Sequence, residues 1–170
     1  MTSRLHRYLL GALALPPGLA TSAAFTSATI EAPAFKTFRM QLTIPGWWAT
    51  GNLYGHIADD ILRITHAAAG GYPVWRPLPI TGDDHYQLGY LDALRSTDSR
   101  IDWVGHWVTR PDSQLPTIAE AGRWLQAGAT QGLFTAVHIL LAVGYVDERL
   151  EVEAYRVIDG RIDLLPVQLP

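Results

Sequence analysis

The alternation of apolar and polar residues is clearest in the last third of the chain. Two alternating runs, 149–157 and 162–167, flank the pair Asp159-Gly160. Asp-Gly is preferred in a two-residue type I′ turn, because both central residues of that turn take positive φ. The sequence therefore predicts a β-hairpin. Its register brings opposite charges and apolar groups into separate pairs: Arg156 with Asp163, Ala154 with Leu165, Val152 with Val167, Tyr155 with Leu164, and Val157 with Ile162.

Four further stretches have the pattern of strands. Residues 133–143 are almost continuously apolar, which favours a strand covered on both faces, although a buried helix has the same pattern. Residues 36–44 alternate between apolar and polar, as in a half-buried strand. Runs 86–94 and 100–110 are predicted to pair antiparallel, with Ile101, Trp103 and Trp107 on one face of the second run. Pro166 lacks an N–H, so the last strand is expected at an edge or leaving the sheet there.

Two stretches have the spacing of helices. In 52–69 the apolar residues recur every three or four positions, which favours a helix; a strand after an Asp59-Asp60 turn is the alternative for 61–65. In 117–127, Thr117 and Glu120 form a capping box. The predicted buried stripe consists of Ile118, Ala121, Gly122 and Leu125, with Gly128 as the C-cap. Strands that come in runs with few helices predict an α+β fold with a mainly antiparallel sheet.

The N-terminus allows two interpretations. Residues 1–25 contain two arginines, an apolar run, a Pro16-Pro17 break and small residues, the layout of a secretory signal with cleavage near Ala24. They equally fit a short apolar helix over 3–15 followed by an arm. The segment is too short and interrupted to span a membrane. We therefore expect residues 1–28 to be an arm or signal peptide, and 29–170 to be a single α+β domain.

Composition narrows the classes of function. Hydrophobic residues make up 48% and charged residues 17% of the chain, so an ordered domain is expected rather than disorder. The net charge is −3 and no basic block occurs, so nucleic-acid binding lacks its electrostatic signature. Cysteine is absent, which excludes disulfides, thiolate catalysis and cysteine-ligated zinc.

Only one cluster suggests catalytic or metal chemistry. Asp83, Asp84 and His85 are consecutive, and a carboxylate beside an imidazole is the minimum for acid–base work or a metal site. A solvated turn gives the same pattern, and we favour that interpretation because no third ligand or nucleophile is marked nearby. The sequence contains no nucleophile elbow, P-loop, dinucleotide fingerprint or zinc-protease motif. We predict neither an enzyme nor a cofactor.

The aromatic residues suggest binding. Trp47 and Trp48 are adjacent between Pro45-Gly46 and Gly51, and two neighbouring indoles in a loop are hard to bury together. An exposed indole stacks on sugars or anchors a protein partner. Trp47, Trp48 and, in a proline-rich stretch, Trp75 are therefore the candidate binding residues, although core packing is the simpler role for each.

These observations favour a non-enzymatic structural subunit of a larger assembly. A phage tail or neck component and a secretion-apparatus part are examples, with partners being copies of this chain or neighbouring subunits, in a virion or in the cytoplasm. The alternative is an exported periplasmic or envelope domain that binds a glycan, lipid or protein through tryptophans. Both are assigned by elimination, because fold alone does not determine function.

Overall fold

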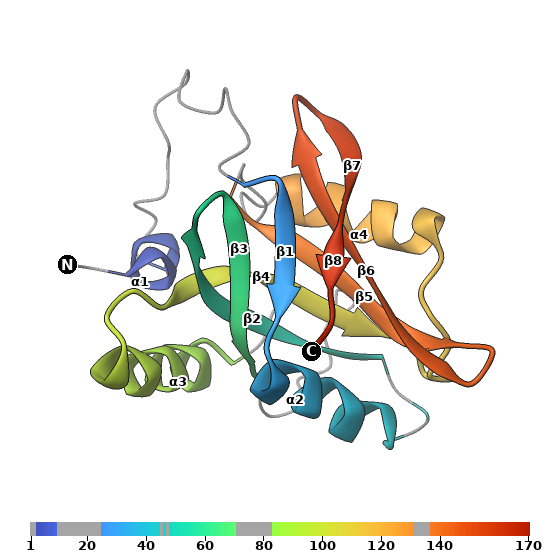
Figure 1. Cartoon of the computed structure of the whole chain (residues 1–170), viewed down its shortest axis with the longest axis horizontal. Coiled ribbons are helices and arrows are strands. Elements are labelled where there is room, and N and C mark those ends of the chain that lie inside the picture. Colours follow the sequence, from blue (N-terminus) through green and yellow to red (C-terminus); the bar gives the residue numbers. More distant parts are fainter. Residues whose placement is uncertain (1–2, 10–24, 45, 47, 71–82, 131–136) are drawn as a thin grey trace.

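The computed structural model describes residues 3–9, 25–44, 46, 48–70, 83–130 and 137–170 (Figure 1). Within these residues the chain forms a strongly curved eight-stranded sheet, close to a barrel, with four helices. The helices are α1 (Arg4–Leu9), α2 (Ala32–Leu42), α3 (Asp84–Thr97) and α4 (Ile118–Thr130). The strands are β1 (Ser27–Ile30), β2 (Ala49–Ala58), β3 (Ile61–Ala67), β4 (Asp102–Thr109), β5 (Ile139–Val146), β6 (Arg149–Ile158), β7 (Arg161–Leu165) and β8 (Val167–Gln168).

The sheet is mixed, so the expectation of a mainly antiparallel sheet is wrong. The strand order is β7-β6-β5-β4-β2-β3-β1-β8. Pairs β1–β3, β1–β8 and β4–β5 are parallel, and the other four pairs are antiparallel. The parallel β4–β5 pair arises because α4 lies between these strands in the chain and provides the crossover that parallel pairing needs. The broader prediction, an α+β fold dominated by a sheet, is confirmed.

The C-terminal hairpin has the predicted register. β6 and β7 pair Ala154 with Leu165 and Arg156 with Asp163. The turn residues Asp159 and Gly160 have φ of 49° and 73°, as a type I′ turn requires. The guanidinium of Arg156 contacts the Asp163 carboxylate at 2.7 Å. The turn and the cross-strand charges therefore select one register together.

The predicted pairing of Val152 with Val167 is wrong, because the chain changes partner at Pro166. β7 ends one residue before the proline, and β8 then pairs in parallel with β1, where Val167 lies opposite Ala28. The Ala28 N–H donates to the Pro166 carbonyl at 2.9 Å. The segment that pairs with β6 thus continues into a strand on the other edge, and this brings the two edges of the sheet together (Figure 1).

The predicted strand over 36–44 is a helix, α2. Pro33 lies in its first turn, where a missing N–H costs nothing. Ala34, Phe38 and Leu42 are spaced by four residues and are buried against the sheet. A strand would place Phe38, Met40, Leu42 and Ile44 together on its apolar side, but Met40 and Ile44 are 58% and 57% exposed.

The predicted helix over 52–69 is the β2–β3 hairpin, so the strand alternative for 61–65 is correct. Asp59 and Asp60 form its turn, with φ of 52° and 59°. Part of β2 is buried on both faces, from Gly51 to Gly55, so its apolar residues do not alternate. That loss of alternation explains why the spacing resembled a helix.

The predicted strand over 86–94 is also a helix, α3. Asp83 caps it, because its side chain accepts a hydrogen bond from the Tyr86 N–H at 3.1 Å. Its buried face consists of Gln87 and Leu91, one turn apart. The N-cap acid favours a helix here, and it outweighs the short alternating run, which favours a strand.

Strand 100–110 is confirmed as β4, but its faces differ from the prediction. Trp103 belongs to one hydrophobic cluster, together with Ile101, whereas Trp107 belongs to the cluster on the other side of the sheet. A bulge near Gly105, where the β2–β4 register shifts, changes the alternation by one residue. The predicted common face for all three residues is therefore wrong.

Helix 117–127 is confirmed as α4, with its capping box. The Thr117 N–H donates to the Glu120 carboxylate at 2.8 Å, and the Glu120 N–H donates to the Thr117 hydroxyl at 3.3 Å. Two details differ from the prediction: Ile118 is 67% exposed, and Gly128 lies inside the helix, not at its C-cap. Strand 133–143 corresponds to β5 from residue 139 onward; residues 133–136 lie outside the described residues.

Of the predicted N-terminal segment, the structure describes α1 and Ser3. Leu5 is buried in the core beside β4, and the Arg4 N–H donates to both oxygens of the Asp102 carboxylate at 3.0 Å. β1 begins at Ser27, within the range predicted as an arm. None of the described helices is both long and apolar enough for a membrane span.

Candidate functional site

The candidate site lies where β2 begins and β4 ends. Ala49 pairs with Thr109 at the end of this ladder, so Trp48, just before β2, and Arg110, just after β4, lie at the same end of the two adjacent strands. The Gly46 N–H donates to the Pro111 carbonyl at 3.0 Å, which keeps the two segments together beyond the strands. The loop after β4 then leads into α4. Three elements thus bring their side chains to one end of the barrel.

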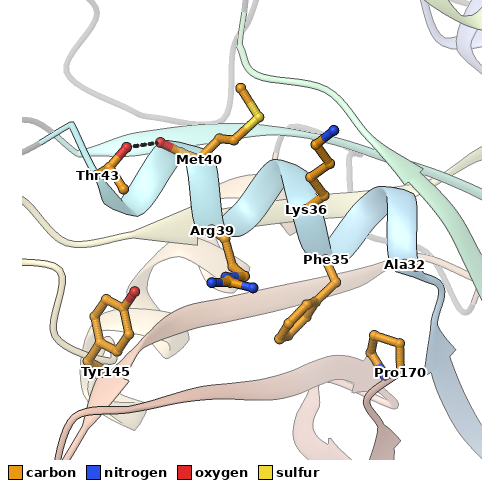
Figure 2. Close-up of a pocket in the computed structure, with 8 residues that line it drawn as sticks. All are labelled: Ala32, Phe35, Lys36, Arg39, Met40, Thr43, Tyr145 and Pro170. Atoms are coloured by element: carbon orange, nitrogen blue, oxygen red, sulfur yellow. Dashed lines mark hydrogen bonds between the residues drawn. The ribbon is translucent and has the colours of Figure 1, made fainter.

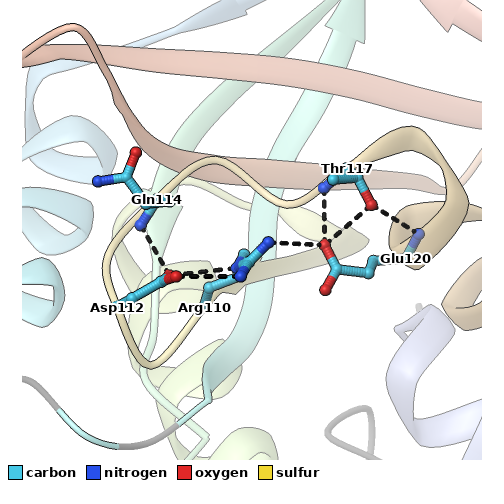
Figure 3. A network of polar contacts seen from close by, with 5 residues as sticks. All are labelled: Arg110, Asp112, Gln114, Thr117 and Glu120. Carbon is cyan, nitrogen blue, oxygen red and sulfur yellow. Dashed lines mark hydrogen bonds and ion pairs between the residues drawn. The ribbon is translucent and has the colours of Figure 1, made fainter.

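Arg110 is the centre of a polar network at this end (Figure 3). Its guanidinium contacts the Asp112 carboxylate at 3.0 Å and the Glu120 carboxylate at 3.3 Å. Glu120 also accepts hydrogen bonds from the Thr117 N–H and hydroxyl, and Asp112 accepts one from the Gln114 N–H at 3.1 Å. One cation therefore holds two carboxylates and connects β4, the loop and the first turn of α4.

The network keeps both acids ionised. The Thr117 N–H lowers the pKa of Glu120, and the Thr117 hydroxyl and Arg110 act in the same direction against partial burial. Partial burial alone would raise the pKa of Asp112, but the hydrogen bond from the Gln114 N–H and the charge of Arg110 outweigh it, and that pKa is also lowered. Carboxylates with lowered pKa values are poor proton donors and weak bases at neutral pH.

Two tryptophans meet beside this network. The rings of Trp48 and Trp124 lie 4.9 Å apart, centre to centre, at an interplanar angle of 55°. Trp124 is four residues after Glu120, so the two share a face of α4. Trp48 remains 40% exposed despite this contact. The site therefore presents an aromatic surface next to a closed ion-pair network.

A groove of about 600 Å³ lies on the other side of the loop (Figure 2). One wall is α2, which contributes Phe35, Lys36, Arg39 and Met40. Tyr145 of β5 and Pro170 stand opposite, and Ala32 and Thr43 complete the lining.

The loop between β4 and α4 connects the groove to the network. The Ser113 hydroxyl donates to the Leu42 carbonyl at the end of α2, at 3.0 Å. The Ser113 carbonyl accepts from the Tyr145 N–H at 2.8 Å, and the Leu115 N–H donates to the Tyr145 carbonyl. The end of α2, the loop and the end of β5 are thus fastened to one another.

We call the side chains Met40, Ile44, Trp48, Ile118 and Val146 the end surface. All five belong to segments that begin or end at this end of the barrel. They are five of the nine large apolar side chains that are strongly exposed in the described residues. More than half of the strongly exposed large apolar side chains in the described residues therefore belong to segments that begin or end at this end of the barrel.

Of the predicted binding residues, Trp48 belongs to the end surface, whereas Trp47 and Trp75 lie outside the described residues. The predicted acid–histidine cluster lies at the start of α3, where Asp83 is the N-cap and Asp84 and His85 are exposed in the first turn. Across the described parts of the chain, no three His, Asp or Glu side chains are grouped as a metal site would require.

Sequence reasoning missed Arg110, Trp124 and Tyr145. One signal was available but was not used: Glu120 of the capping box is four residues before Trp124, a spacing that puts both on the same helix face. Nothing in the spacing connects Arg110 to Glu120, because the loop between them determines that contact.

Comparisons with known proteins identify a fold and no family. No protein-family model matches the chain, and no curated protein matches it. Among solved structures it is similar to the solution structure of protein DSY2949 from Desulfitobacterium hafniense, a structural genomics target, with a TM-score of 0.55. The two share 14% sequence identity over 84% of this chain and 92% of that one. At this level of identity, the likeness establishes the fold alone.

Proposed function

We propose that the protein is a non-enzymatic subunit of a larger protein assembly and that the end surface is its contact with the neighbouring subunit. The observation that carries this proposal is that five of the nine strongly exposed large apolar side chains of the described residues belong to segments at one end of the barrel. Large exposed apolar patches on soluble proteins mark interaction sites. Trp and Met are enriched in protein interfaces, and Trp in particular supplies binding hot spots.

The Arg110 network supports a structural role for this end of the barrel. Arg110 joins β4 to α4 through Glu120 and holds the loop through Asp112. A rigid loop lowers the entropy lost on association, because its side chains are already placed for binding. The lowered pKa values of both acids make them unsuited to proton transfer near neutral pH.

The packing of α1 favours an assembly subunit over the exported alternative. Export with cleavage near Ala24 would remove Leu5 from the core and the Arg4 N–H from Asp102. The Trp48–Trp124 pair suits a protein partner whether or not the protein is exported. Only the exported form would lose the stability that the packing of α1 provides.

The test is the sedimentation of the protein in extracts of its source. The variant Ile44→Glu places a charge on the end surface, and Leu164→Glu on β7 is the matched control, since the two residues are 57% and 59% exposed. We expect wild type and Leu164→Glu to sediment in the same particle and Ile44→Glu to shift to lighter fractions. Equal sedimentation of all three at the size of a free chain would reject the proposal.

A further inference from the structure

We infer that the groove between α2 and β5 binds an extended, acidic segment of the partner protein that carries an apolar anchor. This inference rests on the proposed function, because it specifies the partner of a surface next to the end surface. Shape, apolar lining and charge each contribute to it.

The groove uses a face of α2 that the core leaves free. Ala34, Phe38 and Leu42 point into the sheet, while the lining residues of α2 recur at the three- and four-residue spacing of a neighbouring face. From Ala32 to Thr43 this wall extends about 17 Å, at about 1.5 Å per residue. An extended segment of about five residues covers that length, at about 3.3 Å per residue.

The lining supplies a place for an apolar anchor. Phe35 packs against the core, and Met40 is 58% exposed at the edge of the groove. Phe35 points toward the side of the groove where Tyr145 and Pro170 lie, whereas Met40 projects from the opposite side of α2 (Figure 2). Methionine adapts its shape to a bound side chain, and Tyr adds apolar area with a polar end. The volume of about 600 Å³ is sufficient for several side chains.

The charge of the groove indicates that the bound partner segment is acidic. Lys36 and Arg39 are exposed, and both line the groove. Neither forms an ion pair with another residue of the described chain. None of the eight lining residues has an acidic side chain, although the whole chain has a net charge of −3. A locally basic groove on an acidic protein favours carboxylates and disfavours basic partners.

The experiment measures binding of two labelled peptides to the full chain by fluorescence anisotropy. The acidic probe is fluorescein-Glu-Glu-Phe-Leu-Glu-Glu, and the basic probe replaces each Glu with Lys. We expect the acidic probe to bind about tenfold or more tightly than the basic one at low salt, and to lose binding when Phe-Leu is replaced by Gly-Ser.

The double variant Lys36→Glu with Arg39→Glu should reverse this preference. The control is Arg149→Glu with Arg161→Glu, which changes the net charge equally at exposed arginines outside the groove lining and should leave the preference intact. Lys36→Gln and Arg39→Gln, tested singly, should each weaken acidic binding, and they replace the double variant if it does not fold.

Equal binding of both probes to wild type, or the same loss of preference in the control variant, overturns the inference. The sedimentation of Ile44→Glu separates this failure from that of the proposed function. If wild type still sediments as a particle that Ile44→Glu disrupts, then only the choice of an acidic partner segment is wrong.

Discussion

His106 illustrates how burial sets the chemistry of a single side chain. It lies in β4, is 3% exposed and packs edge-on against Trp103, with ring centres 5.3 Å apart. Burial lowers its pKa to about 3, although a hydrogen bond with the Gly51 backbone acts in the opposite direction. The imidazole is therefore neutral in the folded protein throughout the physiological range.

This lowered pKa predicts a loss of stability in mild acid. In the unfolded chain His106 becomes protonated below about pH 6.5, whereas in the folded chain it stays neutral. The stability that neutral His106 contributes is therefore fully present above about pH 6.5 and decreases as the pH falls below that value. Between about pH 7 and about pH 5 the free energy of unfolding should drop by roughly 2 kcal/mol through this residue. Urea titrations of wild type and His106→Leu measure it. Equal pH dependence in the two proteins would contradict the account.

Residue contacts that lie close in sequence were predictable, and distant ones were not. The Arg156–Asp163 pair follows from the Asp159-Gly160 turn, and the Thr117–Glu120 box follows from its spacing. The Arg110–Glu120 contact depends on a loop that folds back from β4 to α4. No local rule specifies such a path, so the polar centre of the candidate site was not identified from the sequence.

At the scale of elements, the predictions failed where one spacing fits two structures. Phe38 and Leu42 are four residues apart, which satisfies a strand period of two and also one turn of a helix. Pro33 in the first turn and the buried Ala34 decide for the helix. In β2 the opposite error occurred, because burial on both faces removed the alternation that identifies a strand.

Alanine substitutions at two glycines test the backbone conformation of the β6–β7 turn and of α3. A Cβ added at Gly160 or at Gly89 would meet no atom within 4 Å, so any effect of alanine is conformational. Gly160→Ala should destabilise the protein by about 1 kcal/mol, since its φ is +73°. Gly89→Ala, in α3, should stabilise it by roughly 0.5–1 kcal/mol. Thermal unfolding measures both. A stabilising Gly160→Ala would rule out the type I′ turn.

The contribution of α1 to the free energy of unfolding can also be measured with substitutions. Leu5 is 4% exposed, and Tyr8 of the same helix packs against Trp103 with ring centres 5.3 Å apart. Leu5→Ala should lower the free energy of unfolding by about 2 kcal/mol or more. The control Met40→Ala, at a side chain that is 58% exposed, should change it by less than about 0.5 kcal/mol. If chemical denaturation gives equal stability for both variants, α1 is not part of the folded body.

At the scale of the whole molecule, composition indicated an ordered protein, the order of the predicted elements indicated an α+β fold, and the sequence alone predicted the C-terminal hairpin as far as Pro166. The near-closure of the sheet was not predictable, because it depends on strands from both ends of the chain, β1 and β8, meeting through Pro166. The end surface could not be predicted from the sequence either. Its members come from α2, β5, α4 and the segment before β2, and only the fold brings them to one end.

We propose that the working form of this protein is an assembly and that α1 is retained in it. The most direct test is the intact mass of the protein from its native source, together with the sedimentation of the particle that contains it. We predict a chain that retains α1, in a particle several times heavier than the 18.7 kDa of these 170 residues. A free monomer, or a chain that begins near Phe25, would contradict the account and favour an exported binding domain.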